Sequence, residues 1–467
     1  MASLSRQLAQ WVVGLRYEDL PAAVVDRAKS VTLQGLASVL LGSQSRDGQQ
    51  AVKMVVDEEA GVARGVTIMV DGTKVTSGGA AFANAEMAMS GGKWDTFRML
   101  THPGTSILPG AFVAAETAGC SGRDFLTGLV AGYEVMERMA ADFIPTVMSR
   151  GFHAGVVFGI FGPAVAAAKI LGLTEDQVNS TIALCASLAS GNLEGARSGG
   201  RALREGASVR NAMLAVSLAR HGHPGGETVL EGDAGFYHAY AGNNGGQLSY
   251  SFVGDTRTSL GKIVAGLGKE WIFLETILRI YHTAGYNIAH VDVTAKLCEE
   301  HGIRHENVDR VEAVVNWLET QYPSPAFPSR REDLETRAGS TAYFTAYGVV
   351  KRGLPVLWRQ PGPEDPPEVL DLMKRVTIIP SHRMTLFGPR ITVHTKDGKS
   401  YTRQSTGREF MWDFAEETRR IRDVVPGLPI PGEQFGEIIA TCRDLERQAR
   451  ADALIRLTLK KAGRVTP

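Results

Sequence analysis

Cysteine is scarce in this 467-residue chain, and its four cysteines are far apart. They are Cys120, Cys185, Cys298 and Cys442. None belongs to a CxxC pair, so the spacing suggests neither a zinc site nor a disulfide framework. We therefore expect buried free thiols in the reducing environment of the cytoplasm.

The chain also lacks net charge, because 50 Lys and Arg residues balance 50 Asp and Glu residues. A balanced charge creates no whole-protein field that would attract nucleic acid or an anionic membrane surface. No run of about 18 uninterrupted apolar residues is present, and the first 20 residues lack the apolar region of a signal peptide. We expect a cytoplasmic protein that binds neither nucleic acid nor membrane.

Several catalytic motifs are absent. The sequence contains no GxxxxGK[ST] loop, no GxGxxG after a strand, no HExxH and no GxSxG. His221 and His223 are close enough in sequence to share a metal ion, but no carboxylate ligand stands near them. We therefore interpret this pair as a solvated helix end and expect no metal site there.

Small apolar residues dominate the first half of the chain. A length of 467 residues exceeds one ordinary core, so two domains are expected. Apolar residues recur at helical spacing between Pro21 and Gly42. Alanine- and glycine-rich apolar runs follow from about residue 77 to residue 267. Runs that are apolar on nearly all sides predict helices buried inside a large bundle.

The pattern changes near residue 270. β-branched stretches at residues 308–317 and 375–380 predict strands, and residues 390–404 predict a hairpin. A helical pattern returns after about residue 405. The sequence therefore predicts a mainly α fold with an α+β insertion. We expect a large all-helical domain built from both chain ends, residues 1–268 and 406–467, and a smaller α+β lid domain of residues 269–405.

Three histidines stand at predicted junctions between loops and helices. His102 precedes Pro103, and a helix is expected to begin near Pro109. His153 opens an apolar helix, where unpaired backbone N–H groups give a positive potential that disfavours imidazolium. A histidine there stays neutral and can accept a proton. His290 lies near the beginning of the predicted lid. A hydrogen-bonded structural role is the alternative for each.

Arginines gather beside a pair of glycines at Arg201, Arg204 and Arg210. A planar guanidinium can hold a carboxylate with two parallel hydrogen bonds, which predicts an anionic ligand. Surface ion pairing with Glu205 is the equally good alternative at this point.

Several segments together resemble one known family. They are "HPGTSILPGAFVAAE" (102–116), "SGRDFLTGLVAGYEVMERM" (121–139), "GFHAGVVFGIFGPAVAAAKILGLTEDQVNSTIALCASLASG" (151–191), "GASVRNAMLAVSLARHG" (206–222) and "VLEGDAGFY" (229–237). The chain resembles the MmgE/PrpD family, whose members include 2-methylcitrate dehydratase, cis-aconitate decarboxylase and iminodisuccinate epimerase. The resemblance implies a homodimer, a helical domain with a lid, catalysis without metal or organic cofactor, and an active site between the two domains.

Carried over residue by residue, the resemblance makes His102, His153 and His290 the matching family histidines. The family's acid-rich stretch before the first of these is reduced here to Asp95, with Lys93 and Trp94 in place of acids.

Two further positions depart from the family. Arg201 stands where many members have lysine, and an arginine cannot exchange a proton as that lysine could. Tyr343 or Phe344 takes the place of the usual tyrosine.

These residues predict proton chemistry beside a carboxylate. We expect His102 and His153 to act as an acid–base pair, with His290 contributing from the lid and Asp95 orienting a histidine. The side chains expected to bind a small di- or tricarboxylate are Arg201, Lys93, Arg204 and Tyr343. The predicted activity is that of a lyase, a dehydratase or decarboxylase. An epimerase or isomerase is the alternative, and a non-catalytic carboxylate-binding protein is a third possibility.

Overall fold

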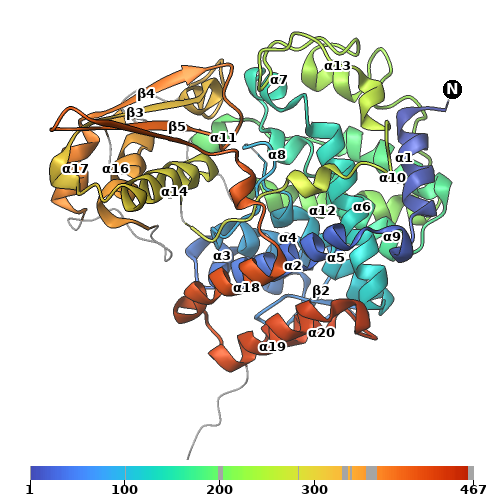
Figure 1. Cartoon of the computed structure of the whole chain (residues 1–467). Helices are drawn as coiled ribbons and strands as arrows, with labels where there is room; N and C mark the ends of the chain where they lie inside the picture. The colour runs from blue at the N-terminus through green and yellow to red at the C-terminus, as the bar shows by residue number, and fades with distance from the viewer. Residues whose placement is uncertain are drawn as a thin grey trace, which may run out of the picture.

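The computed structural model describes residues 2–99, 101–197, 203–281, 283–328, 335–336, 339–353 and 365–460, and at 196, 197, 203 and 204 it describes the backbone alone. Figure 1 shows a broad body of helices beside a small sheet that has helices on one face. The mainly α fold with an α+β portion predicted from the sequence is confirmed.

Helices from both ends of the chain build the body (Figure 1). The helices before the sheet are α1 (Leu4–Gly14), α2 (Ala22–Gly42), α3 (Arg46–Glu59), α4 (Ser77–Ser90), α5 (Gly104–Ala118), α6 (Gly122–Ala140), α7 (Ile144–Ser149), α8 (Ala154–Val157), α9 (Phe161–Ile170), α10 (Glu175–Leu188), α11 (Glu194–Arg197), α12 (Leu203–Arg220) and α13 (Phe236–Ala241). The returning helices are α18 (Phe414–Ile421), α19 (Gly432–Arg443) and α20 (Ala453–Thr458). A short antiparallel pair, β1 (Val66–Thr67) and β2 (Lys74–Val75), joins α3 to α4.

Hydroxyl side chains cap several of these helices. Ser45 accepts a hydrogen bond from the backbone N–H of Gly48 at 3.0 Å, and Thr76 accepts one from Gly79 at 3.0 Å. Ser121 does the same for Asp124 at the start of α6. Each cap satisfies one of the backbone donors that a helix leaves unpaired in its first turn, which fixes where the helix begins.

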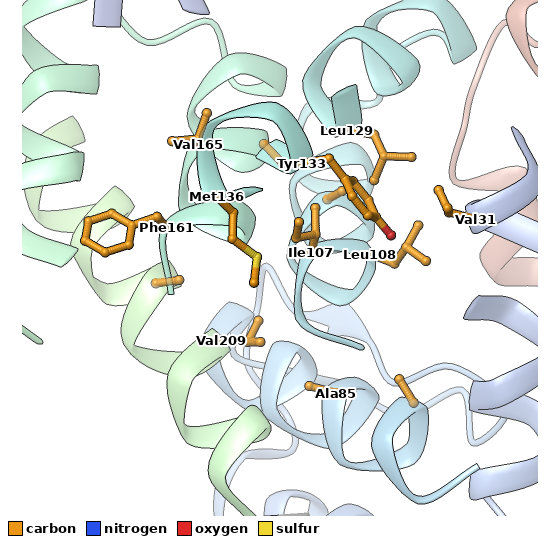
Figure 2. Packing of buried hydrophobic residues seen from close by; sticks show 14 of the residues in the cluster. Val31, Ala85, Ile107, Leu108, Leu129, Tyr133, Met136, Phe161, Val165 and Val209 are labelled. Carbon is orange, nitrogen blue, oxygen red and sulfur yellow. The ribbon is translucent and has the colours of Figure 1, made fainter. Parts of the chain in front are cut away.

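The centre of the body is a close-packed set of small and large apolar residues. Figure 2 shows side chains from α2, α4, α5, α6, α9 and α12 meeting there, among them Val31, Ala85, Ile107, Leu129, Met136, Phe161 and Val209. The phenol ring of Tyr133 lies among these apolar side chains (Figure 2). The small residues of the sequence allow this approach, because their side chains leave room for neighbouring backbones.

The sheet holds four strands in the order β4-β3-β5-β6. They are β3 (Val308–Asn316), β4 (Val376–Ser381), β5 (Arg390–Thr395) and β6 (Ser400–Gln404). β3 pairs with β4 in parallel and with β5 antiparallel, and β5–β6 is the predicted hairpin. Helices α14 (Gly285–Glu300), α16 (Thr341–Lys351) and α17 (Pro367–Met373) lie on one side of the sheet (Figure 1). The connection from β3 to β4 includes α16 and α17, as a parallel pair requires a crossover.

Helix α14 joins two apolar cores. Tyr286, Ile288 and Ala289 belong to the large core of the body, whereas Val291 and Leu297 belong to a smaller core beneath the sheet. The exact division into domains at residues 268 and 405 stays a prediction.

Two helix boundaries differ from the sequence expectation. Helix α5 begins at Gly104, five positions earlier than Pro109, which lies inside it. The apolar helix after His153 is two helices, α8 and α9, separated at residues 158–160. Pro163 explains that break, because proline lacks an N–H and clashes with the carbonyl four residues earlier in a continuous helix. At the third position of α9 it is tolerated.

All four cysteines are free and buried, as expected. Within the described part of the chain, no helix combines the length and the hydropathy needed to cross a membrane.

Candidate functional site

The loop between α4 and α5 carries Lys93, Asp95 and His102. Its conformation is fixed by reciprocal backbone hydrogen bonds between Thr96 and Ile277, at 2.9 and 3.0 Å. This contact joins the loop to the segment that leads into α14, about 180 residues later in the chain. The sequence pattern alone does not reveal that pairing.

Asp95 fastens this loop to the start of α5. Its carboxylate accepts the Gly104 backbone N–H at 2.9 and 3.1 Å and the Tyr133 hydroxyl at 2.6 Å. Burial raises the pKa of Asp95 to about 6, and these hydrogen bonds oppose the rise. Because Pro103 offers no side-chain cap to α5, the Asp95 carboxylate takes that part. Asp95 therefore positions the His102–Pro103 turn.

His102 has a defined ring orientation. Its Nδ1 lies 3.0 Å from the backbone oxygen of Asp95 and 3.3 Å from the hydroxyl of Thr96. A carbonyl oxygen only accepts, so Nδ1 carries the proton and donates it. The neutral ring then has its lone pair on Nε2, which is the nitrogen that can accept a proton. The ring packs against the indole of Trp94 with centroids 4.6 Å apart.

The indole of Trp94 also contacts the guanidinium group of Arg279. The guanidinium carbon of Arg279 lies 4.9 Å from the centre of a Trp94 ring, and Arg279 is 2% exposed. Lys93 is buried beside them, and burial lowers its pKa to about 8, with the charge of Arg279 adding to the effect. A small cavity of about 10 Å³, close to the volume one water needs, is lined in part by Lys93, Trp94 and Asp95.

Two members of this cluster were missed by the sequence reasoning. Trp94 figured there only as a lost acid, and Arg279 was not singled out. Arg279 is one arginine in an otherwise apolar stretch, "ILRIY", and only its contact with Trp94 marks it. We call Lys93, Trp94, Asp95, His102 and Arg279 the Trp94 cluster.

His153 lies on a second loop and forms the N-cap of α8. Its backbone N–H donates to the carbonyl of Gly191 at 3.1 Å, and the residue is 7% exposed. The next residue, Ala154, directs its N–H to the sulfur of Met148 at 3.2 Å. The expected placement of His153 at a helix start is confirmed, although the helix is short.

Both histidine loops border the same part of the α+β portion. A Cβ on Gly285 would lie 3.7 Å from Thr96, beside the first loop. Next to it, the rings of Tyr286 and Tyr322 lie 6.2 Å apart. From there Ser324 donates to the carbonyl of Met148 at 2.9 Å, beside the second loop. The start of α14 and residues 322–324 thus connect the two loops.

His290 lies apart from both loops, inside the α+β portion, and is fully buried. Its Nδ1 is 2.8 Å from the Thr345 hydroxyl, which donates to the carbonyl of Thr341. Nδ1 is therefore the donor to Thr345. Its Nε2 is 3.3 Å from Glu319, whose pKa is raised by burial. With no exposed atom, His290 holds α14 against α16 and the turn after β3.

The other residues that the sequence analysis considered for substrate binding are Tyr343, Arg201, Arg204 and Arg210. The Tyr343 hydroxyl donates to Asp365 at 2.7 Å within the α+β portion, and Tyr343 is 4% exposed. Arg201 lies outside the described residues, as does the side chain of Arg204. Arg210 pairs with Glu59 at 2.8 Å, and not with Glu205, which is buried.

The described residues contain no group of three or more His, Cys, Asp or Glu side chains placed to hold a metal ion. His221 and His223 are exposed, and their Nδ1 atoms donate to the nearby carbonyls of Ser217 and Pro224. This is the solvated helix end that the sequence predicts.

Comparisons with known proteins identify relatives of this chain and its family. It is 26% identical over 423 residues to the cis-aconitate decarboxylase-like protein oryM of Aspergillus oryzae, covering 85% of each chain. It is 26% identical to cis-aconitate decarboxylase of Aspergillus terreus, covering 86% of this chain and 84% of that one. The human cis-aconitate decarboxylase is 27% identical over 58% of each chain. The family model of the MmgE/PrpD N-terminal domain matches residues 6–248, more than half of the sequence, and the chain belongs to the MmgE/PrpD family.

Proposed function

We propose that this protein is a cofactor-independent lyase that decarboxylates a small unsaturated polycarboxylate, with cis-aconitate as the first compound to test. The relatives named as cis-aconitate decarboxylases support decarboxylation over the dehydration that the sequence left equally open. The single observation that carries the proposal is His102, fixed through Nδ1 and packed against a Trp94 that also holds a buried cation.

The reaction needs one proton donor and a cationic surrounding. A carboxylate one carbon away from a C=C bond loses CO₂ when the C–CO₂ bond breaks and its electron pair forms a new double bond. The original double bond shifts, and its far carbon takes up one proton. A second carboxylate on that carbon carries the developing negative charge, which nearby cations stabilise. Lys93 and Arg279 supply positive charge in a buried setting where charges interact strongly.

We assign proton delivery to His102. In its protonated form Nε2–H is the donor, while Nδ1–H remains on the Asp95 carbonyl and keeps the ring oriented. His153 is the second acid–base group of the proposal, returning a proton from solvent to the site. Asp95 and Tyr133 are positioning residues, because they hold the turn that carries His102. His290 supports the α14 side of the site from inside the α+β portion.

Three further parts of the proposal follow from the family resemblance. We propose a homodimer, a cytoplasmic location, and activity that needs neither metal nor organic cofactor, so that dialysis against EDTA leaves turnover unchanged. Arg201 and Arg204 remain predicted carboxylate ligands.

The test is a turnover assay with purified protein and cis-aconitate, following CO₂ release and the change in near-ultraviolet absorbance. We expect turnover by the wild-type chain and a fall of at least 100-fold in kcat for His102→Asn and for His153→Asn, with unchanged thermal unfolding. The matched control is His221→Asn, a substitution of an exposed histidine, which keeps wild-type kcat.

Other results would contradict the proposal. Wild-type activity in His102→Asn would remove the assigned proton donor. Incorporation of deuterium from D₂O into recovered substrate without CO₂ release would instead identify an epimerase or isomerase. Ligand-induced stabilisation with no chemical change across a panel of di- and tricarboxylates would identify a binding protein.

A further inference from the structure

Helix α14 begins beside the Trp94 cluster without a side-chain cap. Its N-cap residue is Ala284, which has no group that can accept a hydrogen bond from the first turn. The helix has 16 residues, so its N-terminus carries a positive partial charge. In its first turn the backbone N–H of Asn287 donates to the carbonyl of Ala284 at 3.0 Å, and no side chain caps the N–H groups before it. The close approach of Gly285 to Thr96 places this end of the helix next to the loop of His102.

A buried amide lies in the same helix turn with one atom unused. Asn287 is 3% exposed, and its Nδ2 donates to the Thr283 hydroxyl at 2.9 Å. Its Oδ1 is buried and has no hydrogen-bond partner. Buried polar atoms are nearly always paired, so Asn287 Oδ1 is an acceptor that a ligand at the start of α14 could satisfy.

The amide can offer a donor to that ligand as readily as an acceptor. Thr283 has a hydroxyl, which donates and accepts equally well. When the Asn287 amide turns over, Oδ1 accepts from Thr283 and Nδ2 points where Oδ1 was. The side chain then adds an N–H to the backbone N–H groups of the first turn, which together suit a carboxylate.

Arg279 is held at the same place. Its Nη1 donates to the backbone carbonyl of Thr283, the residue whose hydroxyl binds Asn287. The guanidinium carbon lies 4.9 Å from a Trp94 ring centre, and the other ring neighbour of Trp94 is His102 at 4.6 Å. A continuous set of contacts therefore runs from Asn287 through Thr283, Arg279 and Trp94 to His102.

The charges near this set favour an anion. Lys93 and Arg279 are buried cations, and the carboxylate of Asp95 is already bound by Gly104 and Tyr133. The buried carboxylate of Glu319 is paired with His290, whose Nε2 lies 3.3 Å from it.

We propose that the first turn of α14, with Asn287 and Arg279, is the subsite for one carboxylate of the polycarboxylate ligand. This inference rests on the proposed function and assigns it a specific contact. The carboxylate bound here is one that remains on the product, because a neutral amide and a permanently charged guanidinium hold it without giving or taking a proton.

The experiment measures binding and turnover separately. Calorimetry with tricarballylate, a saturated tricarboxylate that cannot undergo the reaction, reports the affinity of the site. Asn287→Asp keeps the shape of the side chain and places a negative charge at the helix start, where we expect a Kd for tricarballylate at least 30-fold weaker. In turnover with cis-aconitate, we expect KM to rise by a similar factor while kcat changes less than threefold.

Two controls accompany this variant. Asn307→Asp makes the same charge change at an exposed position of the α+β portion and is expected to bind like the wild type. Asn287→Ser keeps a small polar group without the charge and is expected to weaken binding by less than Asn287→Asp. Circular dichroism and thermal unfolding of each variant separate lost binding from lost folding.

The two proposals fail in different ways. Wild-type affinity for tricarballylate in a folded Asn287→Asp variant, or no binding by the wild-type chain, would overturn the subsite, whether or not the wild type releases CO₂. Loss of tricarballylate binding in Asn287→Asp together with no CO₂ release by the wild type would support the subsite and contradict the decarboxylase. If Asn287→Asp does not fold, equal affinities of Asn287→Ser, Arg279→Gln and the wild type would overturn the subsite.

Discussion

Single buried residues set the pH response of the fold, and Glu417 is the plainest case. It lies in α18, is fully buried, and neither carboxyl oxygen has a hydrogen-bond partner. Burial raises its pKa to about 8, although the charges of Arg27 and Arg420 oppose the rise. The folded chain therefore keeps the Glu417 proton at pH values where the unfolded chain has lost it.

This raised pKa predicts the direction of a stability change. Between the unfolded pKa of about 4.5 and the folded value of about 8, the folded state binds more protons, so its stability falls as pH rises. Glu417→Gln removes the titrating group and should make urea stability at pH 8 greater than that of the wild type by a few kcal/mol, at roughly 1.4 kcal/mol per pKa unit. At pH 4 the two proteins should be nearly equal. A wild-type advantage that grows with pH would contradict this reading.

At the scale of elements, backbone contact between helices explains the wealth of small residues. Gly42 ends α2, and a Cβ placed there would lie 1.8 Å from the carbonyl oxygen of Met87 in α4. The obstacle is backbone, which cannot rotate away as a side chain can. Similar contact at Gly122, with the carbonyl of Leu445, holds the start of α6 against the returning C-terminal segment.

Two alanine substitutions test this close approach. Gly42→Ala should lower the free energy of unfolding by about 2 kcal/mol, because overpacking forces the helices apart. Gly436→Ala in α19 is the matched change, since a Cβ there meets nothing within 4 Å. It should raise stability by up to about 1 kcal/mol through helix propensity. Chemical denaturation measures both, and equal effects would show that contact with Met87 is unimportant.

Across the whole molecule, a few buried polar contacts join the sheet to the helical body. Asn316 at the end of β3 is fully buried, and its Nδ2 donates to the carbonyls of Phe252 at 3.0 Å and Met384 at 2.7 Å. Its Oδ1 accepts the Leu318 N–H at 3.1 Å. One side chain thus ties the residue 252 loop of the body to β3 and to the segment after β4.

Removing the Asn316 amide should weaken the contact between the sheet and the helical body. Asn316→Leu keeps the volume but leaves two buried carbonyls and one N–H unpaired, for a loss of about 2–4 kcal/mol. We expect a lower urea midpoint and faster cleavage near residue 252 in limited proteolysis. Asn307→Leu, at an exposed position, should leave both measurements unchanged. If Asn316→Leu is cleaved at the same rate as the wild type, other contacts hold the sheet against the helical body.

Local sequence predicted a good part of this molecule. The β-branched runs identified β3, β4 and the β5–β6 hairpin, since strand preference and turn residues act between near neighbours in the chain. The start of α5 was predicted five positions too late, although Asp95, the residue that caps it, lies only nine positions before Gly104. The break after His153 was readable in principle from Pro163, whose effect on a helix is local.

The tertiary structure alone decided which of these residues meet. Arg279 reaches Trp94 across 185 positions, and nothing in the residues beside either one encodes that contact. His290 lies in the α+β portion, where the sequence analysis expected it, but only the structure shows that it is fully buried and bound to Thr345 and Glu319. Periodicity and turn chemistry act over a few residues and so fix the elements. The meeting of distant side chains depends on how whole helices pack, which only the folded chain determines.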